Sequence, residues 1–229
     1  MNRGIFIIGT DTGVGKTVIS AGLAAAIRRQ GLRVGVMKPV ATGCRLESGE
    51  WLSDDALALA EAAGLGRESL DQINPVRFEN PMAPLPASRL ENRSVDLDKI
   101  RQAYHEIQSQ SDFMIVEGIG GLLVPITENL FVRDLVAAFG LPVVLVSRTK
   151  LGTINHTMLT IEALRSENIP ILGIIFNRPA DEPVGKDEEF SPLIVGELSD
   201  VPVLGIVPYL KDTNQKSFEE FCDSLVKQL

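Results

Sequence analysis

Short apolar runs alternate along this chain with longer segments in which hydrophobic residues recur at helical spacing. The runs are hydrophobic at nearly every position, as is typical of strands covered on both faces. The predicted strands are residues 5–8, 33–37, 113–116, 143–147, 171–176 and 203–207. The predicted helices are residues 16–30, 55–63, 96–110, 131–139, 154–167 and 217–227. This alternation predicts an α/β fold, with a mostly parallel sheet flanked by helices on both faces.

Two stretches do not fit this alternation. Residues 74–92 carry prolines at positions 75, 81, 84 and 86. Because proline disrupts regular helices and central strands, we expect a long loop there. Residues 179–192 are rich in acidic side chains, and we expect a solvated excursion rather than a linker between domains.

Composition limits the classes of protein to which the chain can belong. Its length of 229 residues suits a single domain spanning residues 1–229, and 45% hydrophobic residues are enough to bury a core. The 22 basic and 30 acidic residues give a net charge of −8. This charge argues against nucleic acid or an anionic membrane as a partner.

The sequence shows no recognisable targeting signal and no paired cysteine motif. We therefore expect a cytoplasmic protein. The longest apolar stretch, residues 135–146, is too short to span a membrane and is interrupted by Gly140 and Pro142. The first residues lack the long apolar run of a secretion signal. Cys44 and Cys222 have no Cys-x-x-Cys partner, so neither a disulfide framework nor a zinc site is predicted.

A phosphate-binding motif follows the first predicted strand and precedes the first predicted helix. Residues 9–17 read GTDTGVGKT. In this context backbone N–H groups of a glycine-rich turn converge on phosphate oxygens, and the helix N-terminus adds positive charge. The residues expected around the phosphates are Gly13, Val14, Gly15 and Lys16. Thr17 would supply a hydroxyl to a magnesium ion.

The motif departs from the usual spacing of a P-loop. Five residues separate Gly9 from Gly15 where four are usual, and Thr10 stands at the expected glycine position. A glycine-rich turn with a chance Lys-Thr pair is the alternative interpretation. The position between a strand and an apolar helix favours a variant P-loop.

A magnesium site needs further oxygen ligands, and the carboxyl ends of the strands are where they are expected. Glu117 follows the third predicted strand and opens a glycine-rich segment, although a surface acid at a turn is an alternative. Asp55 is a second candidate that reads equally well as part of a helix N-terminus. Lys38 follows the second strand, either as a cation that faces the phosphates or as an exposed lysine. These residues indicate a magnesium-dependent enzyme or switch that cleaves a nucleoside triphosphate.

Five separated blocks give the chain a more specific likeness. The blocks are residues 9–17, 38–43, 53–57, 116–121 and 150–156. In order and spacing they resemble the dethiobiotin synthetase family of P-loop enzymes, whose phosphate loop has the same extra residue. The resemblance implies an ATP-dependent cyclo-ligase of biotin biosynthesis. It would take 7,8-diaminopelargonic acid and carbon dioxide (supplied as bicarbonate) and would form dethiobiotin, ADP and phosphate.

The resemblance also implies roles for individual residues around the reacting groups. Thr17, Asp55 and Glu117 resemble the family's magnesium ligands. The residues that resemble those around the carbamate and the transferred phosphoryl group are Thr12, Lys16, Lys38 and Thr42. Positioning and charge compensation are what phosphoryl transfer requires of a protein, so no protein nucleophile is expected.

Further roles follow from the same likeness for the base and the substrate carboxylate. Asn177 resembles the family's adenine-reading asparagine, and Pro208 and Tyr209 resemble a loop beside the base. The segment that resembles the carboxylate-binding turn includes Gly152, Thr153 and Asn155. In the family this turn comes from the neighbouring subunit, so the resemblance implies a homodimer.

Two other classes of P-loop protein remain as alternatives. A partition or septum-site ATPase switch would share the fold, but such switches carry a second lysine near the loop start, where this chain reads Gly9-Thr10-Asp11-Thr12. A glutamine-dependent amidoligase of the corrinoid pathway would need an additional glutaminase domain with a Cys-His pair.

Overall fold

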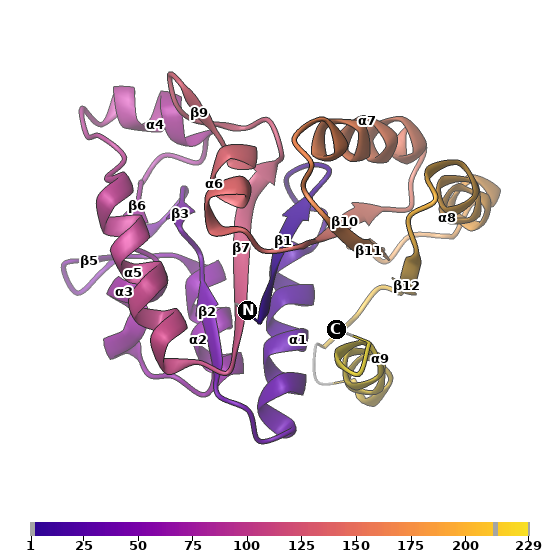
Figure 1. Ribbon diagram of the computed structural model, residues 1–229, viewed down its shortest axis with the longest axis horizontal. Coiled ribbons are helices and arrows are strands. Elements are labelled where there is room, and N and C mark those ends of the chain that lie inside the picture. The colour runs from indigo at the N-terminus through magenta and orange to yellow at the C-terminus, as the bar shows by residue number, and fades with distance from the viewer. Residues whose placement is uncertain (1–2, 213–214, 229) are drawn as a thin grey trace.

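A six-stranded parallel sheet forms the centre of the protein (Figure 1). The computed structural model describes residues 3–212 and 215–228. Its strands, in spatial order, are β12 (Val203–Val207), β11 (Ile171–Asn177), β10 (Val143–Arg148), β1 (Gly4–Gly9), β7 (Phe113–Gly121) and β2 (Val34–Met37). Every neighbouring pair is parallel. The carboxyl ends of all six strands therefore lie at the same edge of the sheet.

Helices cover both faces of this sheet, and the alternation of side chains along β1 shows why. Ile5 and Ile7 pack in one buried cluster, whereas Phe6 and Ile8 pack in the other. The first face is covered by α1 (Lys16–Arg29), α2 (Asp54–Ala63) and α9 (Lys216–Val226). The second face is covered by α5 (Leu97–Gln110), α6 (Val132–Phe139), α7 (Thr153–Ser166) and α8 (Lys186–Ser199). The predicted α/β fold with helices on both faces is confirmed.

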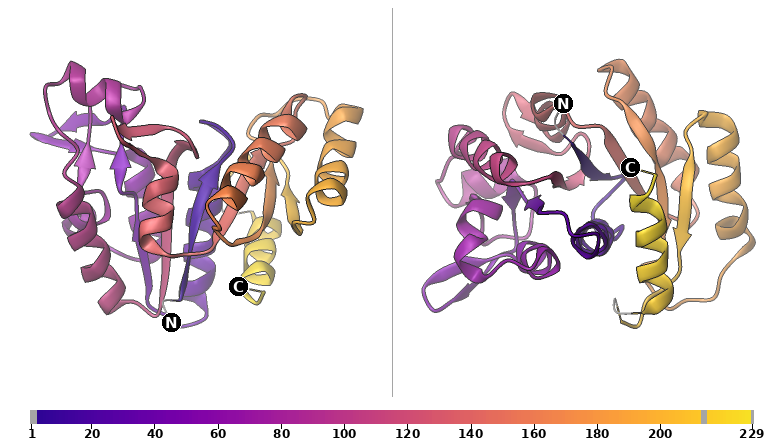
Figure 2. Two further views of the ribbon diagram at one scale, coloured as in Figure 1. Left: turned by 45° about the horizontal axis from the view of Figure 1, so that its top comes forward. Right: turned by 60° about the horizontal axis from the view of Figure 1, so that its bottom comes forward.

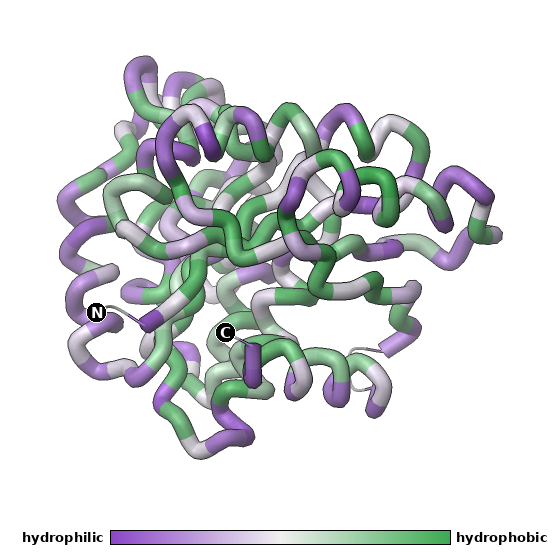
Figure 3. Tube along the Cα trace, turned by 45° about the vertical axis from the view of Figure 1, so that its right-hand side comes forward, coloured by the Kyte–Doolittle hydropathy of each residue, from purple (hydrophilic) through white to green (hydrophobic). Residues whose placement is uncertain are grey.

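The figures show the same arrangement at the C-terminal side of the molecule. In Figure 2 strand β12 lies between α9 on one face and α8 on the other. Figure 3 shows hydrophobic and hydrophilic positions alternating along the helices, as expected of helices with one buried face. No helix within residues 3–212 and 215–228 is long and apolar enough to cross a membrane.

Short elements extend the loops between these helices and strands. In the described part of the chain, two-stranded ribbons join β3 (Val40–Ala41) with β6 (Val76–Arg77), β4 (Arg45–Glu47) with β5 (Glu50–Leu52), and β8 (Pro125–Thr127) with β9 (Leu130–Phe131). The short helices are η1 (Arg67–Ser69), α3 (Leu70–Ile73) and α4 (Pro84–Leu90).

Both stretches predicted to be irregular contain a helix, so the predictions were wrong for residues 84–90 and 186–192, whereas residues 78–83 and 179–185 are irregular as expected. Helix α4 lies inside residues 74–92 and begins at Pro84. Proline is tolerated in the first turn of a helix because the N–H groups there have no partner within the helix. Helix α8 begins at Lys186 and includes Pro192, which is buried along with Val195. Burial of that face against the rest of the fold keeps the helix despite the lost backbone hydrogen bond.

Candidate active site

The phosphate loop connects β1 to α1 at the carboxyl edge of the sheet. Gly13 and Gly15 have positive φ angles of 71° and 96°. A Cβ atom at Gly15 would lie 2.0 Å from the side-chain nitrogen of Asn177, so no larger residue fits there. Helix α1 begins without a side-chain cap, which leaves its first N–H groups to be satisfied by a ligand such as phosphate.

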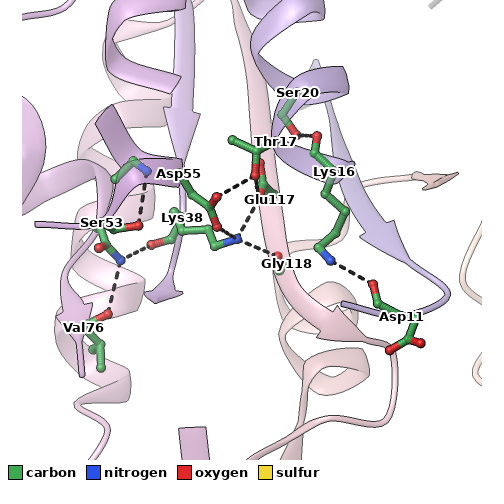
Figure 4. Close-up of polar contacts among 12 residues, drawn as sticks. Asp11, Lys16, Thr17, Ser20, Lys38, Ser53, Asp55, Val76, Glu117 and Gly118 are labelled. Atoms are coloured by element: carbon green, nitrogen blue, oxygen red, sulfur yellow. Dashed lines mark hydrogen bonds and ion pairs between the residues drawn. The ribbon is translucent and has the colours of Figure 1, made fainter. Parts of the chain in front are cut away.

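Lys16 lies at the start of α1 with only 7% of its surface exposed. Its Nζ donates to the backbone oxygen of Asp11 at 3.2 Å, so its side chain folds back along the loop (Figure 4). Burial and the positive charge of Lys38 lower the pKa of Lys16 to about 8, although Glu117 and Asp55 act in the opposite direction. Lys16 is therefore a buried amine that is still mostly charged at neutral pH.

Lys38, the buried Glu117 and the partly exposed Asp55 form an ion cluster beside the loop (Figure 4). The Nζ of Lys38 lies 2.7 Å from Oδ2 of Asp55 and 2.6 Å from Oε1 of Glu117, and it donates to the oxygen of Gly118 at 3.1 Å. Lys38 is 2% exposed and Glu117 is 0% exposed. The alternative of an exposed surface lysine is thus wrong.

The charges of this cluster stabilise one another. Burial alone would lower the pKa of Lys38, but the charges of Glu117 and Asp55 and their hydrogen bonds outweigh it and raise that pKa above its ordinary value. Burial likewise opposes ionisation of Asp55, but the charge and hydrogen bond of Lys38 hold the pKa of that carboxyl below its ordinary value. Lys38 and Asp55 are therefore both charged at neutral pH.

The three residues expected to bind magnesium meet in space. The hydroxyl of Thr17 donates to Oδ1 of Asp55 at 2.8 Å and lies 2.9 Å from Oε1 of Glu117. Glu117 Oε2 is buried and finds no hydrogen-bond partner among the described residues. One hydroxyl and two carboxylates form a hard oxygen donor set, and a buried oxygen without a partner is what a metal ion would satisfy. These residues therefore fit Mg²⁺.

Residues from distant parts of the chain line one cavity of about 290 Å³. They are Thr12, Gly13, Gly15, Lys16, Thr17, Lys38, Thr42, Asp55, Glu117, Ile119 and Gly120. The set includes the phosphate loop, the expected magnesium ligands and the residues expected around the transferred phosphoryl group. Glu117 reaches it from within β7, which continues to Gly121 rather than ending before Glu117 as the sequence suggested.

The residues expected around the base do not line that cavity, although one of them, Asn177, contacts the loop. Asn177 ends β11, is 4% exposed, and donates from Nδ2 to the backbone oxygen of Val14 at 2.9 Å. Val207, the register partner of Asn177, leads into the exposed Pro208 and Tyr209. Asn177 thus binds the backbone of the phosphate loop, whether or not it also contacts a nucleotide base. Its amide nitrogen carries a second hydrogen for such a contact.

The residues expected around the substrate carboxylate do not line the cavity. Gly152 and Asn155 are exposed at the start of α7. Thr153 is 3% exposed, and its hydroxyl donates to the backbone oxygen of Arg148 at 2.5 Å. In a single chain none of these three residues therefore lines the cavity around the phosphate loop.

One cation at this edge was missed by the sequence analysis. Arg148 ends β10, donates to the backbone oxygen of Thr12 at 2.9 Å and lies 3.5 Å from the carboxylate of Asp11. A basic residue at the carboxyl end of a central strand was the signal that could have revealed it. It connects the phosphate loop to the neighbouring strand.

The fold and this site define a P-loop NTPase. Residues 3–217 match the family model described as an AAA domain. The ATP-dependent dethiobiotin synthetase BioD of Thermodesulfovibrio yellowstonii is 44% identical over 229 residues, which cover 96% of this chain and 94% of that relative. The chain therefore belongs to the AAA-domain family and to the ATP-dependent dethiobiotin synthetases.

More distant solved structures share the fold. Cobyrinic acid a,c-diamide synthase from Mycobacterium smegmatis, with bound ADP and magnesium, is 16% identical and has a TM-score of 0.55, covering 99% of this chain and 95% of that chain. The cell division ATPase MinD of Pyrococcus furiosus is 17% identical with a TM-score of 0.54, covering 100% of this chain and 98% of its own. At these identities the likeness shows the fold alone. It therefore does not support the alternative of a partition or septum-site ATPase switch.

The pKa of Lys16 predicts a pH dependence of nucleotide binding. Below about pH 8 Lys16 is charged, whereas above it the free protein loses this proton and must regain it to bind phosphate. The affinity for ADP without magnesium should therefore fall by about tenfold or more as the pH rises from about 7 to about 9.5. Calorimetric titration measures this change. Lys16→Arg is the control because its guanidinium stays charged; an equally steep fall in that variant, or none in the wild type, would refute the assignment.

Proposed function

We propose that this protein closes the ring of dethiobiotin from 7,8-diaminopelargonic acid, carbon dioxide and ATP. The observation that carries the proposal is the meeting of Thr17, Lys38, Asp55 and Glu117 with the phosphate loop around one cavity. This arrangement occurs in a chain that is 44% identical to a dethiobiotin synthetase over nearly its whole length.

The reaction needs no protein nucleophile. One amine of the substrate adds to carbon dioxide and loses a proton, which gives a carbamate. A carbamate oxygen then takes the terminal phosphoryl group of ATP and releases ADP. The second amine attacks the carbamoyl carbon of the mixed anhydride, loses a proton and expels phosphate as the ring closes. The protein's task is to align these groups and to compensate the negative charge that spreads over the phosphoryl oxygens.

The cavity residues suit this task. Lys16 and Lys38 approach from the loop and from the end of β2, so two buried cations face the site where carbamate and phosphoryl oxygens would meet. Thr12 and Thr42 add hydroxyl groups to the same cavity and can hold the carbamate. Ile119 adds an apolar side chain to the lining of the cavity.

Thr17, Asp55 and Glu117 are the residues that would hold magnesium. When bound, the ion would neutralise negative charge on the phosphate oxygens of ATP. A solved structure of the same fold, from Mycobacterium smegmatis, contains ADP and magnesium, which supports the assignment. Asp55 and Glu117 both form ion pairs with the ammonium of Lys38. If they coordinated magnesium instead, this ammonium would be left to bind the carbamate.

A second copy of the chain would complete the substrate site. Gly152, Thr153 and Asn155 do not line the cavity of their own chain, and α7 begins without a side-chain cap, as suits a turn that binds carboxylate. Leu151 is 88% exposed beside this turn and Leu159 is 61% exposed on the same helix. Such exposed apolar side chains support a homodimer that covers them.

The cytoplasm is the compartment that we propose for this reaction. It supplies ATP, and the structure records Cys44 and Cys222 as free, buried thiols. Burial raises the pKa of Cys222 to about 12, and it also raises the pKa of Cys44. Both thiols therefore stay protonated and fit a reducing compartment.

Labelled bicarbonate tests the proposed reaction directly. With magnesium, ATP and 7,8-diaminopelargonic acid, the protein should place the labelled carbon in a cyclic urea and release one phosphate for each ring. Lys38→Met should lower turnover by about a hundredfold or more, because it removes a buried charge next to the reacting oxygens. Mass spectrometry of the product and a phosphate assay measure both quantities.

Lys99→Met is the matched control, since Lys99 is exposed on α5, and it should turn over like the wild type. Product without label, together with ATP hydrolysis that does not respond to the diamine, would overturn the proposed reaction. Wild-type turnover in Lys38→Met would remove Lys38 from the site.

Mixed dimers test whether two subunits share each site. Lys16→Ala should inactivate the phosphate loop of its own subunit, and Asn155→Ala should impair the site of its partner. Each homodimer should be nearly inactive, but a randomly mixed population should regain about one quarter of wild-type activity, because every mixed dimer then holds one intact site. Co-expression of the two variants, each with its own affinity tag, yields the mixed population. If mixing restores nothing, each subunit builds its site from its own residues.

A further inference from the structure

Ser147 lies at the centre of a buried cluster of four hydroxyl groups. It belongs to β10 and is 0% exposed. Its Oγ lies 3.2 Å from Oγ1 of Thr10, 2.8 Å from Oγ1 of Thr153 and 2.8 Å from Oγ1 of Thr157. The cluster therefore joins three segments, namely the phosphate loop, the end of β10 and the first turns of α7.

The shortest contacts of this cluster favour one arrangement of its hydrogens. Thr153 donates its single hydroxyl hydrogen to the backbone oxygen of Arg148, so it accepts from Ser147. Ser147 has then used its own hydrogen, and it accepts from both Thr10 and Thr157. Ser147 thus makes one donated and two accepted hydrogen bonds, which satisfies the hydroxyl completely.

The cluster also accounts for the unusual residue in the phosphate loop. Thr10 stands where glycine is expected, and its side chain reaches Ser147 on the neighbouring strand. Its backbone N–H additionally donates to the oxygen of Val146 at 3.0 Å. The backbone bond fixes the loop to β10 independently of the hydroxyls, whereas the first turn of α7 is tied to β10 by Thr153 and Thr157.

We propose that Ser147 is a positioning residue that holds the first turn of α7 in register for the carboxylate of the substrate. The proposal rests on the proposed function, in which Gly152 and Asn155 of this turn bind that carboxylate. Thr153, which lies between them, contributes its buried hydroxyl to the cluster. Because Ser147 is 0% exposed, it would act through α7 rather than by contact with a ligand.

Loss of the Ser147 hydroxyl should affect the substrate more than the nucleotide. In Ser147→Ala the hydroxyl of Thr10 loses its acceptor, and Thr153 and Thr157 lose their 2.8 Å partner and keep only their 3.5 Å contact with each other. The start of α7 would then loosen. The phosphate loop would keep its backbone bond to Val146 and the hydrogen bond from Asn177 to Val14.

Steady-state kinetics of the ring-closing reaction test this inference. Ser147→Ala should raise the KM for the diamine by about tenfold and change kcat and the KM for ATP by less than about threefold. Thr157→Val keeps the shape of its side chain without the hydroxyl and should raise the same KM by about threefold. Thr157→Ser restores the hydroxyl and should restore the wild-type KM. Thr160→Val is the control, because the Thr160 hydroxyl donates only within α7, to the oxygen of His156 at 2.8 Å.

Each result bears on a different claim. An unchanged KM for the diamine in Ser147→Ala, or no difference between Thr157→Val and Thr157→Ser, overturns the positioning role. A rise confined to the KM for ATP also overturns it, because the cluster would then serve the phosphate loop. Wild-type protein that shows no turnover dependent on the diamine would instead refute the proposed function, and with it the role of Ser147.

Discussion

A lysine ammonium buried between two carboxylates is the interaction on which the site depends. Lys38 comes from the end of β2, Asp55 from α2 and Glu117 from β7, and Nζ lies within 2.7 Å of an oxygen of each acid. A buried charge is costly without partners, so removing any member leaves the others uncompensated. This requirement holds α2 and two strands in one arrangement. It also keeps the oxygens of Asp55 and Glu117 next to Thr17 at the phosphate loop.

Hydrogen bonds from neighbouring strands fix the phosphate loop on its other side. Asn177 donates to the oxygen of Val14, Arg148 to that of Thr12, and Ser147 accepts from Thr10. All three are at or next to the carboxyl ends of β10, which pairs with β1, and of β11, which pairs with β10. The loop is therefore shaped before any ligand arrives, which limits the reorganisation that phosphoryl transfer would require.

The sequence predicted those features that arise from local patterns. Hydrophobic periodicity identified the strands and helices of the main sheet, and residues 9–17 revealed the phosphate loop. Helices α4 and α8 were missed because tolerance of Pro84 and Pro192 depends on helix position and tertiary packing. The importance of Asp55 and Lys38 followed only from resemblance, and the cluster around Ser147 was not predicted. Both depend on which segments the sheet brings together, and no spacing along the chain encodes that.

The magnesium dependence of ADP binding tests the central claim most directly, namely that Thr17, Asp55 and Glu117 form a metal site at the phosphate loop. Calorimetry with and without Mg²⁺ should show that the ion raises the affinity of the wild type by about tenfold or more. Glu117→Gln should lose most of that gain while its affinity without magnesium stays within about threefold of the wild type. A Glu117→Gln variant that keeps the full gain from magnesium would contradict the account.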